Sequence, residues 1–86
     1  MPYHVELLPS AHRDLKRLTK AVQIRIAVRL RGLVENPRPT GMVKLAGTEN
    51  LWRIRIGDYR VVYEIHDDRL IVLVVRVAHR KDVYRG

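Results

Sequence analysis

Apolar and polar residues alternate over residues 52–56, which is the period of a strand with one buried face. When the apolar residues point into the core, Arg53 and Arg55 stand side by side on the opposite face. The Gly-Asp pair at 57–58 is a turn signal, and residues 61–65 read as the returning strand. The pattern therefore predicts a β-hairpin with two arginines on its outer face.

A third arginine, Arg60, enters the second strand close to this pair. Three guanidinium groups at one end of a hairpin repel one another, so the fold gives little reason to gather them. A solvated strand face is the simpler interpretation of an isolated Arg-x-Arg pair. With Arg60 and the C-terminal residues considered below, we interpret the cluster as a site that faces a polyanion. Tyr63 and Trp52 are interpreted as core residues of the hairpin.

The N-terminal half predicts one strand followed by two helices. Residues 3–7 alternate as a short strand does, and Ser10 is a suitable N-cap for the first helix. Thr19 is the expected cap of a longer helix over residues 20–35. The segment 36–41 contains two prolines and a glycine, which end that helix.

The second half is rich in strands. A short piece around residues 43–45 precedes the hairpin, and residues 70–77 form the last strand after a turn at Asp67 and Asp68. Residues 70–75 are all apolar, so we expect this strand to lie centrally and to be covered on both faces. The predicted architecture is one α+β domain over residues 1–86, with an N-terminal strand, a two-helix hairpin and an antiparallel sheet.

The second helix carries a core stripe at helical spacing. Its members are Val22, Ile26, Leu30 and Leu33, widened by Ala27 and Val34. Ile24 and Val28 lie on the far flank, next to Arg25 and Arg31. This flank either packs against the first helix or forms an exposed apolar strip that a partner covers.

Composition adds a strong positive charge to this picture. The chain has 86 residues, and 17 Lys plus Arg against 9 Asp plus Glu give a net charge of +8. This excess favours nucleic acid or an acidic protein as the partner. The absence of Cys excludes disulfides and the usual structural zinc sites. Neither a membrane-spanning run nor a signal peptide is recognisable, so a bacterial or archaeal cytoplasm is the simplest location, with no membrane partner.

The C-terminal residues add candidate chemistry at the end of the last strand. His79 and Arg80 follow that strand directly, and Tyr84 comes four residues after Arg80. No acidic pair, phosphate-binding loop or nucleophile motif accompanies them, and we expect neither a metal nor a cofactor. Guanidinium groups bind phosphate oxygens and offset the charge that grows in a phosphoryl transition state. Histidine can move protons near neutral pH, although a lone strand-end histidine is more often bonded to backbone.

Three segments of the chain resemble the RelE/ParE superfamily of toxins from type II toxin–antitoxin modules. They are residues 44–47 (Lys-Leu-Ala-Gly), the hairpin at 51–63, and the ending at 79–84 (His-Arg-Lys-Asp-Val-Tyr). The resemblance covers nearly the whole chain and implies a fold similar to small microbial ribonucleases. For the RelE branch it implies metal-independent cleavage of mRNA on the ribosome, in which the 2′-hydroxyl attacks the adjacent phosphate.

The resemblance also assigns expected roles to individual residues. Arg53 and Arg55 take two basic hairpin positions, Arg60 the phosphate-binding position, Arg80 the arginine after the strand and Tyr84 the C-terminal tyrosine. His79 matches a variable position. Arginine at both hairpin positions departs from the lysines often found there and disfavours a general base at these sites, because the pKa of arginine is above roughly 12. The ParE branch, which inhibits DNA gyrase, is the alternative.

Further basic residues are expected to contact RNA or an acidic partner. The predicted RNA-binding residues are Lys44, Arg13, Lys16, Arg17 and Lys81. The resemblance implies an acidic, RelB-like antitoxin, besides the ribosome and mRNA, as a partner. We expect the antitoxin to dock on the helical flank and to mask the segment 80–84. The predicted antitoxin-binding residues are Ile24, Val28, Arg25 and Arg31.

Overall fold

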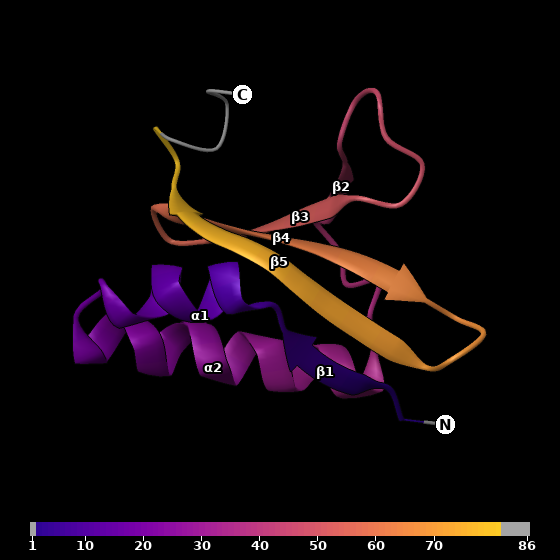
Figure 1. The fold of residues 1–86 in the computed structure, drawn as a ribbon, viewed down its shortest axis with the longest axis horizontal. Helices are drawn as coiled ribbons and strands as arrows, with labels where there is room; N and C mark the ends of the chain where they lie inside the picture. Colours follow the sequence, from indigo (N-terminus) through magenta and orange to yellow (C-terminus); the bar gives the residue numbers. More distant parts are fainter. Residues whose placement is uncertain (1, 82–86) are drawn as a thin grey trace.

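The computed structural model describes residues 2–81. These residues form two helices and one five-stranded sheet in the strand order β1-β5-β4-β3-β2, with both helices on the same side of the sheet (Figure 1). β1 pairs with β5 in parallel, and every other pair is antiparallel. The α+β architecture expected from the sequence is therefore confirmed. The elements are β1 (His4–Leu7), α1 (Pro9–Lys16), α2 (Lys20–Glu35), β2 (Val43–Lys44), β3 (Trp52–Ile56), β4 (Tyr59–His66) and β5 (Ile71–His79).

The predicted hairpin is formed by β3 and β4. Gly57 occupies the first turn position with φ of +61°, in the left-handed region that suits a two-residue hairpin turn. A side chain at this position would also crowd α2, because an added Cβ would lie 3.1 Å from an Nη atom of Arg25. The turn therefore requires glycine for its conformation, whereas the exposed end of the Arg25 side chain can shift to make room for a Cβ.

The core lies between the helices and the inner face of the sheet. Ile26 and Leu33 of α2 are fully buried there against Ile54 of β3 and Tyr63 of β4. Tyr63 donates a hydrogen bond to the carbonyl of Pro37 at 3.1 Å, and burial raises its pKa to about 12. The interpretation of Tyr63 as a core residue is confirmed.

Helix α1 covers the edge of β5 in the part that β1 does not reach. The hydroxyl of Ser10 donates to the carbonyl of Val75 at 2.7 Å, and the backbone N–H of Val77 donates to a carboxylate oxygen of Asp14 at 2.9 Å. Asp14 also accepts from Nε of Arg76 at 2.8 Å. The expectation that Ser10 caps α1 is wrong. The helix begins at Pro9 with Leu8 at the N-cap position, two residues before the predicted cap, and the Ser10 hydroxyl binds the sheet edge instead.

The second helix follows its prediction more closely. It spans Lys20–Glu35, and the Thr19 hydroxyl accepts a hydrogen bond from the Val22 N–H at 3.4 Å. Ile26, Leu30 and Leu33 form the buried stripe. Ala27 does not widen this stripe as expected, because it is exposed.

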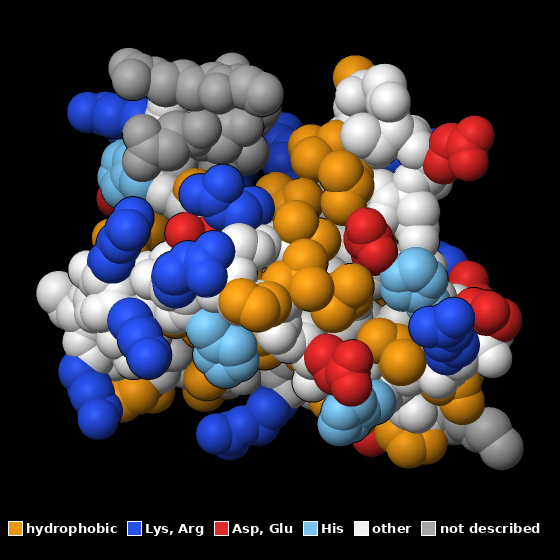
Figure 2. All heavy atoms as spheres, in the orientation of Figure 1, with side chains coloured by type: hydrophobic (Ala, Val, Ile, Leu, Met, Phe, Trp, Pro, Cys, Tyr) orange, Lys and Arg blue, Asp and Glu red, His pale blue; other side chains and the backbone are white. Residues whose placement is uncertain are grey.

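No helix formed by residues 2–81 covers the outer face of the sheet. Ile71, Leu73 and Val75 of β5 are only half-buried, so the prediction that this strand is covered on both faces is wrong for residues 2–81. Its central position is confirmed, because β5 lies between β1 and β4. Figure 2 shows apolar side chains running across the middle of the face seen in Figure 1.

An ionic network ties the N-terminal strand to the β4–β5 turn. The Asp67 carboxylate accepts hydrogen bonds from both terminal nitrogens of Arg38, at 3.1 and 2.7 Å, and from the Tyr3 hydroxyl. The hydrogen bonds from Arg38, followed by the one from Tyr3, lower the pKa of Asp67 to about 2.

This network predicts a pH dependence of stability. The folded-state pKa of Asp67 lies below its unfolded value of roughly 3.9, so ionisation of Asp67 stabilises the folded chain above about pH 4. This contribution is lost as the pH falls towards 2. The loss should be small because the ion pair is half-exposed and screened by solvent. In urea unfolding at pH 5 and pH 2, wild type should lose more stability than Asp67→Asn. Equal losses would contradict the assignment.

Candidate active site

The three hairpin arginines meet on the outer face of the sheet. Arg55 of β3 is the direct cross-strand partner of Arg60 of β4. Arg53 lies on the same face of β3, two residues before Arg55. The side chains of directly opposed residues lie on one face and within contact distance. Together with Gly41 and Val43, these arginines line a hollow of about 210 Å³. The grouping predicted from the alternation is therefore present.

The β3–β4 turn organises the arginines around this hollow. Arg55 donates from Nε to the carbonyl of Gly57 at 3.1 Å. The backbone N–H of Arg80 donates to the carbonyl of Asp58 at 2.7 Å, and Nε of Arg80 lies 4.0 Å from the Asp58 carboxylate. Arg80 also lies two residues after Ala78, the register partner of Arg60. The turn thus brings a fourth guanidinium to the same end of the hairpin.

His79 lies on the opposite face of the sheet. Its register partner is Tyr59, which packs against the core, whereas Arg60 points to the outer face. The rings of Tyr59 and His79 make an edge-to-face contact with centroids 5.5 Å apart. His79 also lines a separate cavity of about 340 Å³ with Asp14 and Arg17 of the α1 region. The structure therefore does not bring His79 together with the arginine cluster.

The other predicted RNA-binding residues are spread over the helix side and the strand ends. Arg13, Lys16 and Arg17 are exposed at the end of α1, and Lys81 is exposed after β5. Figure 2 shows Lys and Arg side chains gathered over the part of this face where α1 lies. Lys44 of β2 places its ammonium 6.0 Å from the ring centre of Trp52. The predicted Tyr84 lies outside the described residues.

The apolar flank of α2 is exposed. Ile24 and Val28 are each 56% exposed, which excludes the alternative that this flank packs against the first helix. With Arg25 and Ile56 they line a groove of about 360 Å³ that runs from α2 to the β3–β4 turn. Arg31 lies elsewhere, in a groove on the other side of α2 next to β1.

The arrangement on the outer face suits binding and polarisation of a phosphate group. Several guanidinium groups converge on one hollow, where they can bind phosphate oxygens and offset their negative charge. The sequence reasoning treated Asp58 only as a turn residue and missed its contact with Arg80. The Gly-Asp turn signal next to the arginines was the sequence feature that could have indicated this contact.

Among residues 2–81, no group of three His, Cys, Asp or Glu side chains is close enough to hold a metal ion. Within the same residues, both helices fall short of the length and apolar character that a membrane-spanning helix requires.

Comparison with known proteins identifies the family. Residues 5–84 match the family described as ParE toxin of type II toxin–antitoxin system, parDE. Toxin RelE of Mycobacterium tuberculosis is 38% identical over 98% of this chain and 88% of its own length. The mRNA interferase toxin RelE of Escherichia coli is 26% identical, over 94% of this chain and 86% of its own length.

The fold agrees with these sequence relationships. A chain of the Mycobacterium tuberculosis toxin–antitoxin complex RelBE2 superimposes with a TM-score of 0.84 at 28% identity, over 93% of this chain and 100% of that chain. Sequence and fold both match over nearly the whole length. The chain therefore belongs to the RelE/ParE superfamily and is a toxin of a type II toxin–antitoxin system.

Proposed function

We propose that this toxin is a ribosome-dependent, metal-independent endoribonuclease that cleaves mRNA. The observation that carries the proposal is the convergence of Arg53, Arg55 and Arg60 on one hollow, with Arg80 at the adjacent turn. The name of its Escherichia coli relative, an mRNA interferase, supports the same activity. The site would bind the scissile phosphate of an mRNA strand presented on the ribosome.

The proposed reaction needs no group beyond the RNA and the protein. The 2′-oxygen forms a bond to the adjacent phosphorus while the bond from phosphorus to the 5′-oxygen breaks, which leaves a 2′,3′-cyclic phosphate and a 5′-hydroxyl. The 2′-hydroxyl loses its proton and the 5′-oxygen gains one. Arg60 and Arg80 would stabilise the negative charge of the phosphorane transition state. We assign Arg53 and Arg55 to the same electrostatic role, and propose Tyr84 as a further site residue.

His79 has a minor part in this proposal. It packs against Tyr59 on the face of the sheet that turns away from the arginines. We expect His79→Gln to lower the cleavage rate by less than about tenfold, since loss of a general base typically costs 10²–10⁴-fold. The measurement is single-turnover cleavage of ribosome-bound mRNA. A loss of 100-fold or more would place His79 in the chemistry and contradict our interpretation.

The basic surface around α1 fits ribosomal RNA. Arg13, Lys16 and Arg17 are exposed together, and phosphate contacts by such side chains give affinity that falls with rising salt. We assign Lys44 and Lys81 to the same kind of contact. This interaction would position the toxin so that the arginine hollow faces the mRNA.

We also propose an acidic antitoxin as partner. The support is the net charge of +8 together with the similarity to a toxin that is found in a toxin–antitoxin complex. The groove at Ile24 and Val28, flanked by Arg25, would take an amphipathic segment with acidic neighbours. The binding segment is expected to be disordered when free and to fold on the toxin.

The groove at Ile24 and Val28 gives a direct test of antitoxin docking. Ile24→Asp/Val28→Asp should weaken binding of the co-expressed product of the adjacent gene by at least about 100-fold, because it places two carboxylates in an apolar contact. Both positions are exposed, so the fold should persist. Calorimetric titration measures the affinity, and circular dichroism of the free variant checks that it is folded. Unchanged affinity in a folded variant would show that the partner docks elsewhere.

Gyrase inhibition is the second candidate, and the match to the ParE family favours it. Such a toxin would act by binding and would perform no chemistry of its own. Purified wild-type protein in a gyrase supercoiling assay separates the two functions. Intact supercoiling together with cut mRNA supports the nuclease, whereas lost supercoiling with intact mRNA supports gyrase inhibition.

A further inference from the structure

A second cavity lies where the end of β5 meets the end of α1. It has a volume of about 340 Å³, which falls in the range of small-molecule sites, about 300–1,000 Å³. Tyr59 and His79 contribute aromatic rings to its lining, and Asp14, Arg17 and Arg76 contribute charged groups. The phosphate chemistry proposed above gives this cavity no role.

The two aromatic rings form a stacking surface. Tyr59 and His79 meet edge to face, with an angle of 84° between their planes and their centroids 5.5 Å apart. In such a pair, the ring that offers its edge keeps both of its own faces clear of the other ring. Both residues are half-buried, so packing holds them in place while they still line the cavity. A planar base that enters the cavity can therefore stack on an aromatic face.

The Asp14 carboxylate determines which chemical group fits beside these rings. Its side chain is only 12% exposed. Oδ2 accepts from Nε of Arg76 at 2.8 Å and from the N–H of Val77 at 2.9 Å. Within residues 2–81, Oδ1 has only a longer contact of 3.4 Å with Arg76, so it can accept a further hydrogen bond. An N–H group on the edge of a base can donate this bond, whereas the carboxylate repels a phosphate.

Arg76 connects the cavity to the arginine hollow on the outer face of the sheet. The register places Arg76 opposite Val62, which in turn lies opposite Arg53, so the three residues share that face. Neighbouring strands lie about 4.8 Å apart, which puts the backbones of Arg53 and Arg76 roughly 10 Å from each other. The Arg76 side chain then reaches over the edge of β5 to Asp14. A single RNA strand with one phosphate in the hollow can follow this row to the cavity.

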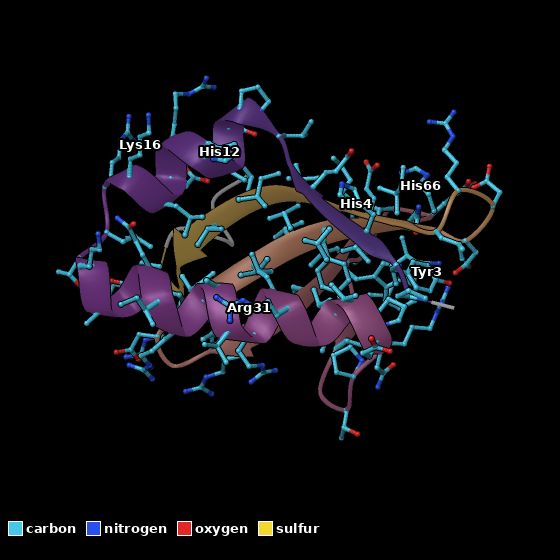
Figure 3. All side chains as sticks on the ribbon, turned by 90° about the horizontal axis from the view of Figure 1, so that it is seen from below. Tyr3, His4, His12, Lys16, Arg31 and His66 are labelled. Carbon is cyan, nitrogen blue, oxygen red and sulfur yellow. The ribbon has the colours of Figure 1, made fainter. Side chains whose placement is uncertain are left out.

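Arg17 lies at the rim of the cavity, directly after α1. Within residues 2–81, its guanidinium group has no hydrogen-bond or ion-pair partner. Of the three basic residues described at the end of α1, Arg17 alone also lines the cavity. Figure 3 shows the side chain of Lys16 pointing away from the sheet. Arg17 is therefore placed to contact a nucleotide whose base enters the cavity.

We infer that this cavity binds one base of the mRNA strand, from a neighbour of the nucleotide that is cut. The base would stack on the Tyr59–His79 pair and donate an N–H to Oδ1 of Asp14. Arg17 and Arg76 would hold its flanking phosphates. The inference rests on the proposed nuclease function and adds a site that selects the mRNA sequence without taking part in bond breaking.

Two oligonucleotides separate base recognition from phosphate binding. One probe is a short single-stranded RNA with 2′-O-methyl groups, which lacks the attacking hydroxyl, and the other is an abasic strand of the same length. NMR of the whole toxin follows the ring resonances of Tyr59 and His79 and the backbone amide of Arg55 in the hollow. The Arg55 amide should shift with both probes, and the two rings should shift with the base-bearing strand alone. The ring of Tyr3, at the other end of the sheet, should shift with neither.

A matched pair of tyrosine substitutions tests the stacking contact. Tyr59→Leu removes an aromatic face but keeps apolar contact with the core, and Tyr3→Leu makes the same change in another half-buried tyrosine. Tyr59→Leu should bind the base-bearing RNA at least about fivefold more weakly than Tyr3→Leu, as expected for one lost stacked base, with equal affinity for the abasic strand. On programmed ribosomes, Tyr59→Leu should also change the relative use of cleavage sites, while Tyr3→Leu keeps the wild-type pattern. If Tyr59→Leu does not fold, the ring resonances of wild type still decide.

Ring shifts with the base-bearing strand alone support the inference. Ring shifts with both strands would show a phosphate site and overturn the base. A response of Arg55 without ring shifts, or an unchanged cleavage pattern in folded Tyr59→Leu, overturns the inference and leaves the nuclease in place. Absence of any shift overturns RNA binding at the cavity and at the hollow alike. If wild type cuts no mRNA on ribosomes, the proposed nuclease function fails, and the inference fails with it.

Discussion

Arg60→Ala is expected to lower mRNA cleavage by at least about 100-fold, and Arg60→Ala/Arg80→Ala to abolish it. Loss of one charged donor to a developing oxyanion typically costs on the order of 3 kcal/mol of transition-state stabilisation. Arg60 lines the hollow and lies opposite Arg55, and Arg80 is held at the adjacent turn. The measurement is single-turnover cleavage of mRNA on purified, programmed ribosomes.

Two controls separate this effect from loss of structure or charge. Arg69→Ala removes an equally charged, exposed side chain from the β4–β5 turn and should keep nearly full activity. Arg60→Ala should also remain folded, because Arg60 lies on the outer face of the sheet and is not part of the apolar core, and circular dichroism checks this. A double variant that still cleaves mRNA would contradict the proposed electrostatic role.

Ile26→Ala is expected to cause a large loss of stability. Ile26 is fully buried between α2 and the sheet, so truncation removes apolar contacts and leaves a cavity. Comparable substitutions cost about 2–5 kcal/mol, a large part of the stability of a domain of this size. Each kcal/mol lowers the melting temperature of such a domain by about 4–8 °C, so a decrease of at least about 8 °C is expected.

The neighbouring helix position gives a matched control for Ile26→Ala. Ile24→Ala removes the same atoms from a side chain that is 56% exposed, and should change the free energy of unfolding by less than about 0.5–1 kcal/mol. Thermal melting of both variants, followed by circular dichroism, makes the comparison. Equal losses would contradict the assigned orientation of α2.

The sequence was informative wherever a local pattern determines the structure. Alternation over residues 52–56 and the Gly-Asp turn placed the hairpin and its arginines correctly, because strand period and turn conformation are local properties. Helix α2 was equally accessible through its apolar spacing, the Thr19 cap and the prolines that follow it.

Features set by tertiary packing were not predictable in the same way. The parallel pairing of β1 with β5 joins strands from the two ends of the described chain, and no local pattern encodes it. The register shift between Val62 and Tyr63 is another example, because it changes which residues of β5 face the core. The role of Ser10 changed for a similar reason, since its hydroxyl serves a distant strand.

In the candidate site too, residues placed by a local pattern were predictable and contacts set by tertiary packing were not. Arg53, Arg55 and Arg60 follow from the hairpin, and Arg80 follows because β5 pairs with β4. Sequence proximity alone suggested that His79 belongs with Arg80, but strand alternation turns neighbouring residues to opposite faces. The ionic network of Tyr3, Arg38 and Asp67 was also missed, because its members come from three separate segments.

The most direct test of the proposed function is a map of mRNA 5′ ends after brief induction of the toxin in growing cells. We expect new ends at codon-phased positions with wild type and with Arg69→Ala, and none with Arg60→Ala/Arg80→Ala. New ends that persist in the double variant would contradict the assigned site. Growth arrest by wild type without any new mRNA ends would contradict the nuclease itself.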